Sequence, residues 1–215
     1  HKLSEWSDAI TSDEGMTAGR GLTEDQRLDV IMEILEVFTR LWHERAGDGV
    51  ESFDLIRLLQ RDAHTANLVN DPKNYIGNLI LLIVGGNDTT RNSMSGGVLF
   101  LNDFPEQFER VKADRSLIPS MVSEIIRFQT PLSHMRRTVT QDTDFKGHRM
   151  KAGDKVVLWY CSANRDELVI PNADRFLIDR SGVRNHAAFG FGIHRCMGNR
   201  LAEMQLRIVW DEALK

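Results

Sequence analysis

The sequence predicts a mainly α-helical protein with a minor β region. Apolar residues recur at helical spacing in two long segments, one beginning at Thr23 and one at Pro72. No further proline occurs in the second segment before Pro105. From Thr138 to Val157 the pattern changes to alternation with glycine-bearing turns, which is typical of strands and hairpins.

Composition narrows the class of protein. The 215 residues suit one domain or two small ones, and a hydrophobic fraction of 41% permits a substantial core. A net charge of −4 argues against a general nucleic-acid binder. Two distant cysteines form no disulfide framework and no secretory signal is visible, so we expect a cytoplasmic protein. The longest apolar run, Leu79 to Val84, is far shorter than the roughly 20 residues of a membrane span.

The first half of the chain is expected to consist of helices, with a polar, glycine-bearing loop over residues 11–21. The expected helices cover residues 3–10, 23–46, 52–61 and 72–102. Thr23 and Gln26 form a capping-box signature at the start of the second helix. Asp71 suits the N-cap of the fourth helix and Pro72 its first position.

Two adjacent glycines, Gly85 and Gly86, lie in the middle of the fourth helix. Each costs about 1 kcal/mol relative to alanine there, so something must require them. Close packing of small residues against another helix is one reading. Asp88 and Thr89 follow directly and favour a second reading, in which an acid and a hydroxyl beside a locally opened helix pass protons toward a bound ligand.

The second half is expected to contain shorter helices and then strands. Helices are expected from Phe104-Pro105 onward and from Pro119 to Gln129. In the latter, Glu124 and Arg127 are three residues apart and share a face, although most such pairs are solvated surface pairs. Residues 156–161 read as a buried strand, followed by an irregular stretch up to residue 189.

The segment from Phe189 to Gly198 is a glycine-rich loop that ends in Cys196 and opens a last helix. Unpaired N–H groups and the helix dipole at this position favour a thiolate, which is a soft metal ligand. An isolated cysteine is more often a small buried hydrophobe. A zinc site is poorly supported, since His194 and Cys196 are only a pair and the other cysteine, Cys161, lies in an apolar run. The dinucleotide fingerprint fails as well, because Gly190-x-Gly192 lacks the third glycine.

Three motifs in order resemble the cytochrome P-450 superfamily. F-x-x-G-x-H-x-C-x-G at residues 189–198 resembles its haem-ligand loop, G-G-x-D-T at 85–89 resembles its oxygen-binding helix, and E-x-x-R at 124–127 resembles its helical ion pair. The resemblance implies a cytochrome P-450 fold, haem b as cofactor and Cys196 as the axial iron ligand. It covers residues 1–215 as part of one haem-thiolate domain, without the N-terminal helices and C-terminal strands of the family.

The resemblance also assigns residue roles. Gly85 and Gly86 are implied to form a kink over the haem, and Asp88 and Thr89 to deliver protons during dioxygen activation. Arg137, with His134 as a further candidate, and His194 are implied to meet the haem propionates, whereas Arg136 reads as surface charge. The implied haem-contacting and network residues are Phe189, Gly190, His194, Cys196 and Gly198 in the loop, and Glu124, Arg127 and Arg175 in a structural ion network.

The function implied is a monooxygenase that inserts one oxygen atom of O₂ into an unactivated C–H bond. Residues 85–95 and 131–138 look like the bacterial branch that hydroxylates the terminal carbon of medium-chain alkanes. Apolar residues near the haem, Leu82, Ile83, Leu132 and Met135, would equally suit a fatty acid or a terpene. Electrons are expected from a ferredoxin and its reductase, docked on Arg195, Arg200 and Arg207, although a basic helix face is usually just solvated. The alternatives are a peroxygenase, an isomerase, or a non-enzymatic helical interaction module.

Overall fold

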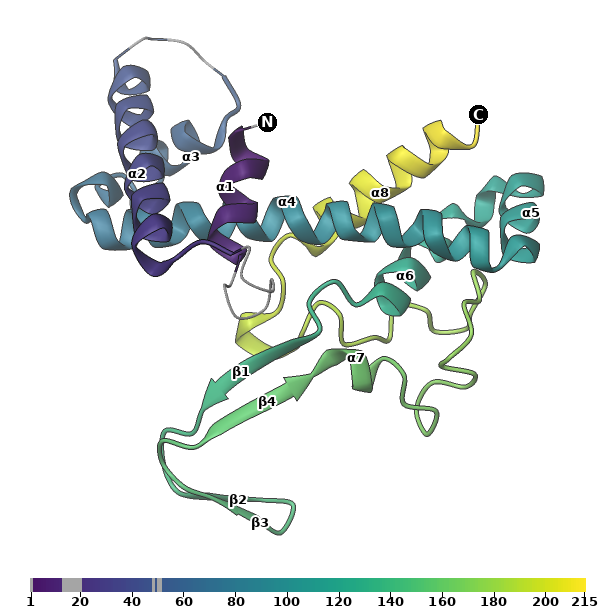
Figure 1. The fold of residues 1–215 in the computed structure, drawn as a ribbon. Helices are drawn as coiled ribbons and strands as arrows, with labels where there is room; N and C mark the ends of the chain where they lie inside the picture. Colours follow the sequence, from purple (N-terminus) through teal and green to yellow (C-terminus); the bar gives the residue numbers. More distant parts are fainter. Residues whose placement is uncertain (1, 13–20, 48, 50–51) are drawn as a thin grey trace. The chain divides into compact units, whose positions relative to one another are not determined.

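The computed structural model describes residues 2–12, 21–47, 49 and 52–215 and is mainly helical, as the sequence predicts (Figure 1). The chain divides into two compact units, residues 1–88 and 89–215. One long helix, α4 (Pro72–Asp103), runs across the boundary between them. The single haem-thiolate domain expected from the sequence stays a prediction.

The first unit is built from helices around a small aromatic and aliphatic core. Its elements are α1 (Lys2–Thr11), α2 (Glu24–Ala46), α3 (Leu55–Arg61), a short 3₁₀ helix (Leu68–Asn70) and the first part of α4. The predicted capping box is confirmed: the Thr23 hydroxyl accepts from the Gln26 amide at 3.3 Å, and the Gln26 side chain accepts from the Thr23 amide at 3.0 Å. Helix α3 begins later than expected because Asp54 caps it through the amides of residues 56 and 57. The core of the unit consists of Trp42, Ile56, Tyr75 and Leu79.

The second unit packs four of its helices around a larger core. Its elements are the rest of α4, α5 (Pro105–Ala113), a 3₁₀ helix (Arg115–Leu117), α6 (Ile118–Gln129), β1 (His134–Thr138), β2 (Thr143–Phe145), β3 (His148–Met150), β4 (Lys155–Trp159), α7 (Tyr160–Ala163), a 3₁₀ helix (Gly192–His194) and α8 (Asn199–Ala213). A Cβ on Gly97 would lie 2.5 Å from the Trp210 ring and 2.9 Å from Ile125. A Cβ on Gly96 would lie 2.3 Å from the Gln129 side chain. The close approach of Trp210 and Ile125 to α4 therefore depends on Gly97, whereas the flexible Gln129 side chain can move away from Gly96.

Helix α4 is continuous across Gly85 and Gly86. The expected local opening of the helix at this point is absent. Glycine adopts helical backbone angles as well as others, so the pair permits an opening without imposing one. Within the described part of the first unit, no heavy atom beyond the helix's own backbone and chain neighbours lies within 4 Å of a Cβ built on either glycine. Packing inside that unit therefore does not explain the pair.

The β region consists of two small antiparallel pairs, β1 with β4 and β2 with β3. Lys146 (φ 51°) and Gly147 (φ 82°) form the predicted turn between β2 and β3. The expectation of a buried strand over residues 156–161 is wrong: β4 ends at Trp159, whose exposed fraction is 56%, and α7 follows at once. Among the described residues β4 pairs only with β1, so this two-stranded sheet cannot bury its apolar side chains.

No helix in the described ranges combines the length and the apolar character that a membrane crossing requires.

Candidate functional site

Cys196 lies in the loop that leads into α8, two residues before the N-cap residue Gly198. Its amide donates to the Phe189 carbonyl at 2.9 Å, which closes the loop. Gly190 and Gly192 have φ angles of 65° and 76°, in the left-handed region that favours glycine. A Cβ on Gly190 would also lie 3.1 Å from the Tyr160 hydroxyl. The glycines are therefore required by the loop conformation that presents the cysteine.

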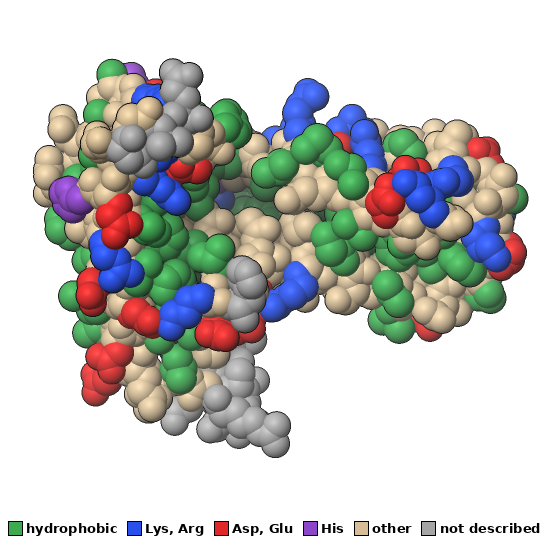
Figure 2. Space-filling model, turned by 90° about the horizontal axis from the view of Figure 1, so that it is seen from above, with side chains coloured by type: hydrophobic (Ala, Val, Ile, Leu, Met, Phe, Trp, Pro, Cys, Tyr) green, Lys and Arg blue, Asp and Glu red, His purple; other side chains and the backbone are tan. Residues whose placement is uncertain are grey.

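Cys196 and several apolar side chains of its loop are exposed. Cys196 itself is exposed, so the reading as a buried hydrophobe is wrong. The exposed fractions of Phe191, Ile193 and Met197 are 70%, 97% and 85%. No described heavy atom lies within 4 Å of a Cβ built on Gly198. Further apolar side chains reach the surface along both units (Figure 2).

This donor set fits a haem. The described residues contain no group of three or more His, Cys, Asp or Glu side chains that could hold a metal ion, which argues against a protein-only zinc site. A single soft sulfur ligand, with exposed apolar side chains beside it in the same loop, suits an iron whose other ligands belong to a flat organic ring. The loop therefore offers what a haem-thiolate centre requires of its protein.

A polar pocket of about 510 Å³ adjoins the cysteine loop within the second unit. It is lined by Arg184, His186, Phe189, Arg195, Cys196, Asn199, Arg200 and Glu203. Burial lowers the pKa of His186 to about 4, and the nearby Glu203 carboxylate opposes this shift. Glu203 is itself buried and pairs with Arg184 at 2.6 Å and Arg207 at 3.4 Å. Sequence analysis missed His186 and Glu203; the only signal available was the i, i+4 spacing of Glu203 and Arg207.

The three arginines expected to form a docking surface differ in their exposure to solvent and in whether a carboxylate pairs with them. Arg195 and Arg200 are exposed, and both line the pocket beside Cys196. Arg207 is half-buried and its charge is partly neutralised by Glu203. Only two of the three arginines present an exposed charge beside the loop.

Strand β1 separates two of the residues expected to meet the haem. Successive side chains of a strand point to opposite faces, so His134 and Arg137 lie on opposite faces of β1. The His134 ring lies 4.8 Å from the Trp159 ring, and Arg137 Nη1 donates to the Arg136 carbonyl at 2.9 Å. A flat group on one face of β1 would meet only one of the two. His194, in the cysteine loop, is exposed.

The expected ion pair between Glu124 and Arg127 is present and buried, with exposed side-chain fractions of 0% and 1%. Two bonds of 2.8 Å join Arg127 Nε and Nη2 to the Glu124 carboxylate. The expected third partner is wrong. Arg180 Nε lies 3.1 and 3.2 Å from the two Glu124 oxygens, whereas Arg175 contributes only its backbone carbonyl, to Arg127 and Arg180.

Chain direction explains this difference. The amide of Leu177 donates to Glu124 at 2.9 Å, which brings the backbone after Arg175 to the carboxylate. The Arg175 guanidinium points away and lies 5.8 Å from the Phe104 ring. The side chain of Arg180 then reaches back to fill the position beside Glu124.

Asp88 and Thr89 are consecutive on α4, at the boundary between the two units. Within the first unit, the Ser7 hydroxyl of α1 donates to Asp88 Oδ2 at 2.5 Å. Within the second, the Thr89 carbonyl accepts from the Ser93 hydroxyl at 2.9 Å. No pattern in the sequence predicts the contact of Ser7 with Asp88.

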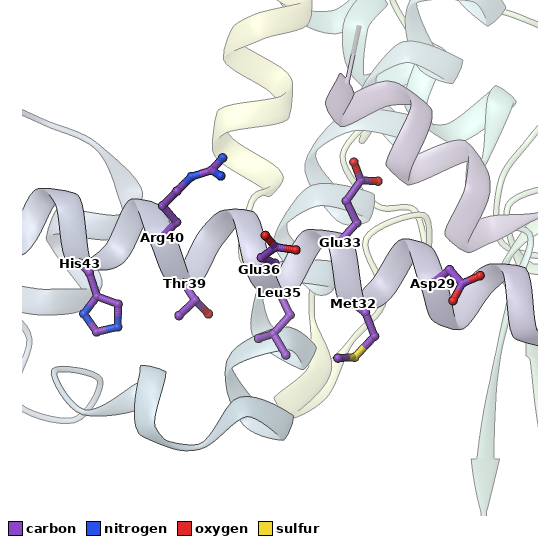
Figure 3. A pocket seen from close by; sticks show the side chains of 8 residues that line it. All are labelled: Asp29, Met32, Glu33, Leu35, Glu36, Thr39, Arg40 and His43. Carbon is purple, nitrogen blue, oxygen red and sulfur yellow. The ribbon is translucent and has the colours of Figure 1, made fainter.

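A second open pocket, of about 730 Å³, runs along α2 in the first unit (Figure 3). Its lining residues are Asp29, Met32, Glu33, Leu35, Glu36, Thr39, Arg40 and His43. One of its carboxylates, that of Glu33, is already paired with Lys2 at 2.6 Å and accepts from the Trp6 ring N–H at 3.0 Å. None of the three sequence motifs lies in this pocket, so the cysteine loop remains the candidate site.

An exposed cysteine beside exposed apolar side chains, in a loop that leads into a helix, is the arrangement that the haem-thiolate class of proteins requires. Comparison with known proteins identifies the family. Residues 30–215 match the family model described as Cytochrome P450. The chain belongs to the cytochrome P450 family, which uses haem with a cysteine thiolate as the iron ligand.

Solved and curated relatives agree with this assignment. Cytochrome P450-153 from Novosphingobium aromaticivorans aligns with a TM-score of 0.88 and 48% identity over 99% of this chain and 51% of its own. Linalool 8-monooxygenase of Pseudomonas putida is 48% identical over 139 residues, 65% of this chain and 34% of that protein. A methyl-branched lipid omega-hydroxylase of Mycobacterium tuberculosis is 48% identical over 136 residues, 62% of this chain and 31% of that protein. The chain spans about a third of these curated relatives and about half of the solved one.

Proposed function

We propose that the chain is part of a haem-thiolate monooxygenase that hydroxylates an apolar substrate. The observation that carries this proposal is the exposed Cys196, held in a glycine-dependent loop at the start of α8. Membership of the cytochrome P450 family and the monooxygenase and hydroxylase names of the relatives support it.

In this proposal each residue has a defined task. The haem, when bound, supplies an iron that activates dioxygen. The Cys196 sulfur would hold that iron and donate electron density to it. Arg137 and His194 pair with the carboxylates of the cofactor, for which the planar guanidinium of arginine is well suited. The apolar side chains Phe191, Ile193 and Met197 keep water from the ring.

Proton movement is assigned to Asp88 and Thr89. The Ser7 hydroxyl donates to Asp88 Oδ2 and so orients the carboxyl group that we assign to proton transfer. The Thr89 hydroxyl is the next group along the helix and passes the proton onward. Gly85 and Gly86, one turn earlier, keep that side of α4 free of side chains.

The substrate is proposed to be a medium-chain alkane or fatty acid, hydroxylated at its terminal carbon. The omega-hydroxylase name of one relative supports attack at a chain end, whereas the linalool 8-monooxygenase name supports a terpene instead. The apolar side chains proposed to meet the substrate are Leu82, Ile83, Leu132 and Met135. Incubation of the holoenzyme with an alkane, a fatty acid and a terpene of matched length, with product analysis, distinguishes these choices.

Electrons are proposed to arrive from a ferredoxin and its reductase at the face bearing Arg195 and Arg200. These two exposed cations are complementary to an acidic partner. The cytoplasmic location, inferred from the cysteine usage, remains a prediction. Arg195→Glu and Arg200→Glu are expected to slow reduction by ferredoxin more than reduction by dithionite, because only the former needs the docked complex.

The decisive test is the carbon monoxide difference spectrum of the dithionite-reduced protein. The chain is examined alone and joined to the N-terminal half of a solved relative, with Cys196→Ser as the control. A long-wavelength Soret band that disappears in the control is the expected result. A peroxygenase or isomerase would show the same band but would not need the Thr89 hydroxyl. Absence of the band in both forms would leave only the interaction module.

A further inference from the structure

Asn164, the residue after α7, joins three separate segments of the second unit. Its exposed fraction is 0%. Its side-chain Nδ2 donates to the Thr130 hydroxyl at 2.8 Å, and its Oδ1 accepts from the Ala187 amide at 2.6 Å. Its backbone carbonyl accepts from Arg127 Nη1 at 2.6 Å. Both side-chain groups and the carbonyl are therefore satisfied inside the protein, which leaves little freedom to this residue.

One of these bonds leads to the cysteine. Ala187 is held by Asn164 through its amide, and its carbonyl accepts from the Gly190 amide at 2.8 Å. Between them lies Phe189, whose carbonyl accepts from the Cys196 amide at 2.9 Å. The Asn164 side chain is therefore the anchor of the turn against which the cysteine is closed.

A second bond leads toward Arg137. Thr130 ends α6 with a φ of 43°, which is strained for a β-branched residue. It is held there by two bonds: its hydroxyl donates to the Arg127 carbonyl at 2.7 Å and accepts from Asn164. Strand β1, which contains Arg137, begins four residues later. Asn164 therefore also fixes the exit from α6 into β1.

We propose that Asn164 is a positioning residue that holds the Cys196 loop and the start of β1 in register with the buried Glu124–Arg127 pair. This inference rests on the proposed function, in which Cys196 is the iron ligand. The bond from Asn164 to Ala187 positions the cysteine, and the bond from Asn164 to Thr130 positions strand β1. The effect on the cysteine is therefore separable from the effect on folding.

Three variants of the haem-loaded full chain test this separation, with Asn102→Ala as the matched control. Asn102 is an exposed asparagine whose side chain, among the described residues, donates only to the Val98 carbonyl of its own helix. Asn164→Ala removes both side-chain bonds. Asn164→Asp retains the oxygen that accepts from Ala187. Thr130→Val removes the hydroxyl that Asn164 binds and leaves the bond to Ala187 intact.

The measured quantity is the ratio of the long-wavelength to the short-wavelength band in the reduced carbon monoxide spectrum, together with the urea midpoint. We expect Asn164→Ala to lower the ratio about tenfold, the effect of leaving one buried donor unpaired. Asn164→Asp and Thr130→Val should lower the urea midpoint but keep the ratio close to that of the control.

If Asn164 had a purely structural role, the band ratio would fall in all three variants in proportion to their loss of stability. That result would overturn the inference. If Asn164→Ala yields no holoprotein, Asn164→Asp decides, and a lowered ratio there also overturns it. Absence of the long-wavelength band in the unsubstituted protein overturns the proposed function and the inference together.

Discussion

Replacing Arg180 by methionine should destabilise the protein much more than replacing Arg175, although the sequence pattern singles out Arg175. The Arg180 side chain is 7% exposed and meets both oxygens of the buried Glu124 carboxylate. The Arg175 side chain is at the surface, 5.8 Å from the Phe104 ring. Methionine preserves the apolar stem in both variants, so the comparison isolates the guanidinium groups.

The magnitude follows from what each guanidinium binds. Breaking a buried pair costs about 3–5 kcal/mol. Here Glu124 retains Arg127 and the Leu177 amide, so we expect the cost of Arg180→Met to be about 2–3 kcal/mol, that of a lost charge-assisted hydrogen bond. An exposed cation–π contact is worth about 0.5–1 kcal/mol, which limits the cost of Arg175→Met. The difference of about 2 kcal/mol corresponds to about a thirtyfold change in the unfolding equilibrium.

Urea denaturation followed by far-ultraviolet circular dichroism measures both free energies of unfolding on the same footing. Equal costs for the two variants, or a larger cost for Arg175→Met, would refute the assignment of Arg180 as the third member of the network. A cost below about 0.5 kcal/mol for both would refute the argument that the buried carboxylate needs a second cation at all.

Three further predictions test the packing, the buried histidine and the proton path. Gly97→Ala should destabilise the protein by about 1–3 kcal/mol because the new Cβ would collide with Trp210. Gly86→Ala should stabilise the helix by up to about 1 kcal/mol while lowering turnover. Thermal melts measure the two stability changes, and product formation measures the loss of turnover. Burial lowers the pKa of His186 from 6.5 to about 4. Between pH 6.5 and pH 4 the unfolded chain therefore binds a proton at this histidine that the folded chain does not bind. The free energy of unfolding should fall by up to about 3 kcal/mol as the pH drops from 6.5 to 4. His186→Gln should remove this dependence, and a pH series of urea titrations in which both proteins lose stability equally would contradict the assignment. Thr89→Ala should leave haem binding unchanged but consume more NAD(P)H per product formed, and unchanged coupling would contradict the proton path.

Local signals in the sequence were sufficient for most helices. The capping box at Thr23 and the proline at position 72 mark helix starts because caps and fixed φ angles act within one turn. The turn at Gly147 is equally local. By contrast, the continuous apolar run of residues 156–161 indicated a buried strand, and such a run contains no information on whether another layer covers it.

The sequence by itself determined the family, since the spacing around Cys196 and the Gly85–Thr89 motif are properties of contiguous residues. Only the tertiary structure decided which arginine completes the Glu124 network, and that Asn164 joins the cysteine loop to α6. These contacts join residues that are 23 to 56 positions apart in the chain. The irregular segment between α7 and α8 determines which residues reach Glu124 and Asn164, and no periodicity along the sequence encodes the path of that segment.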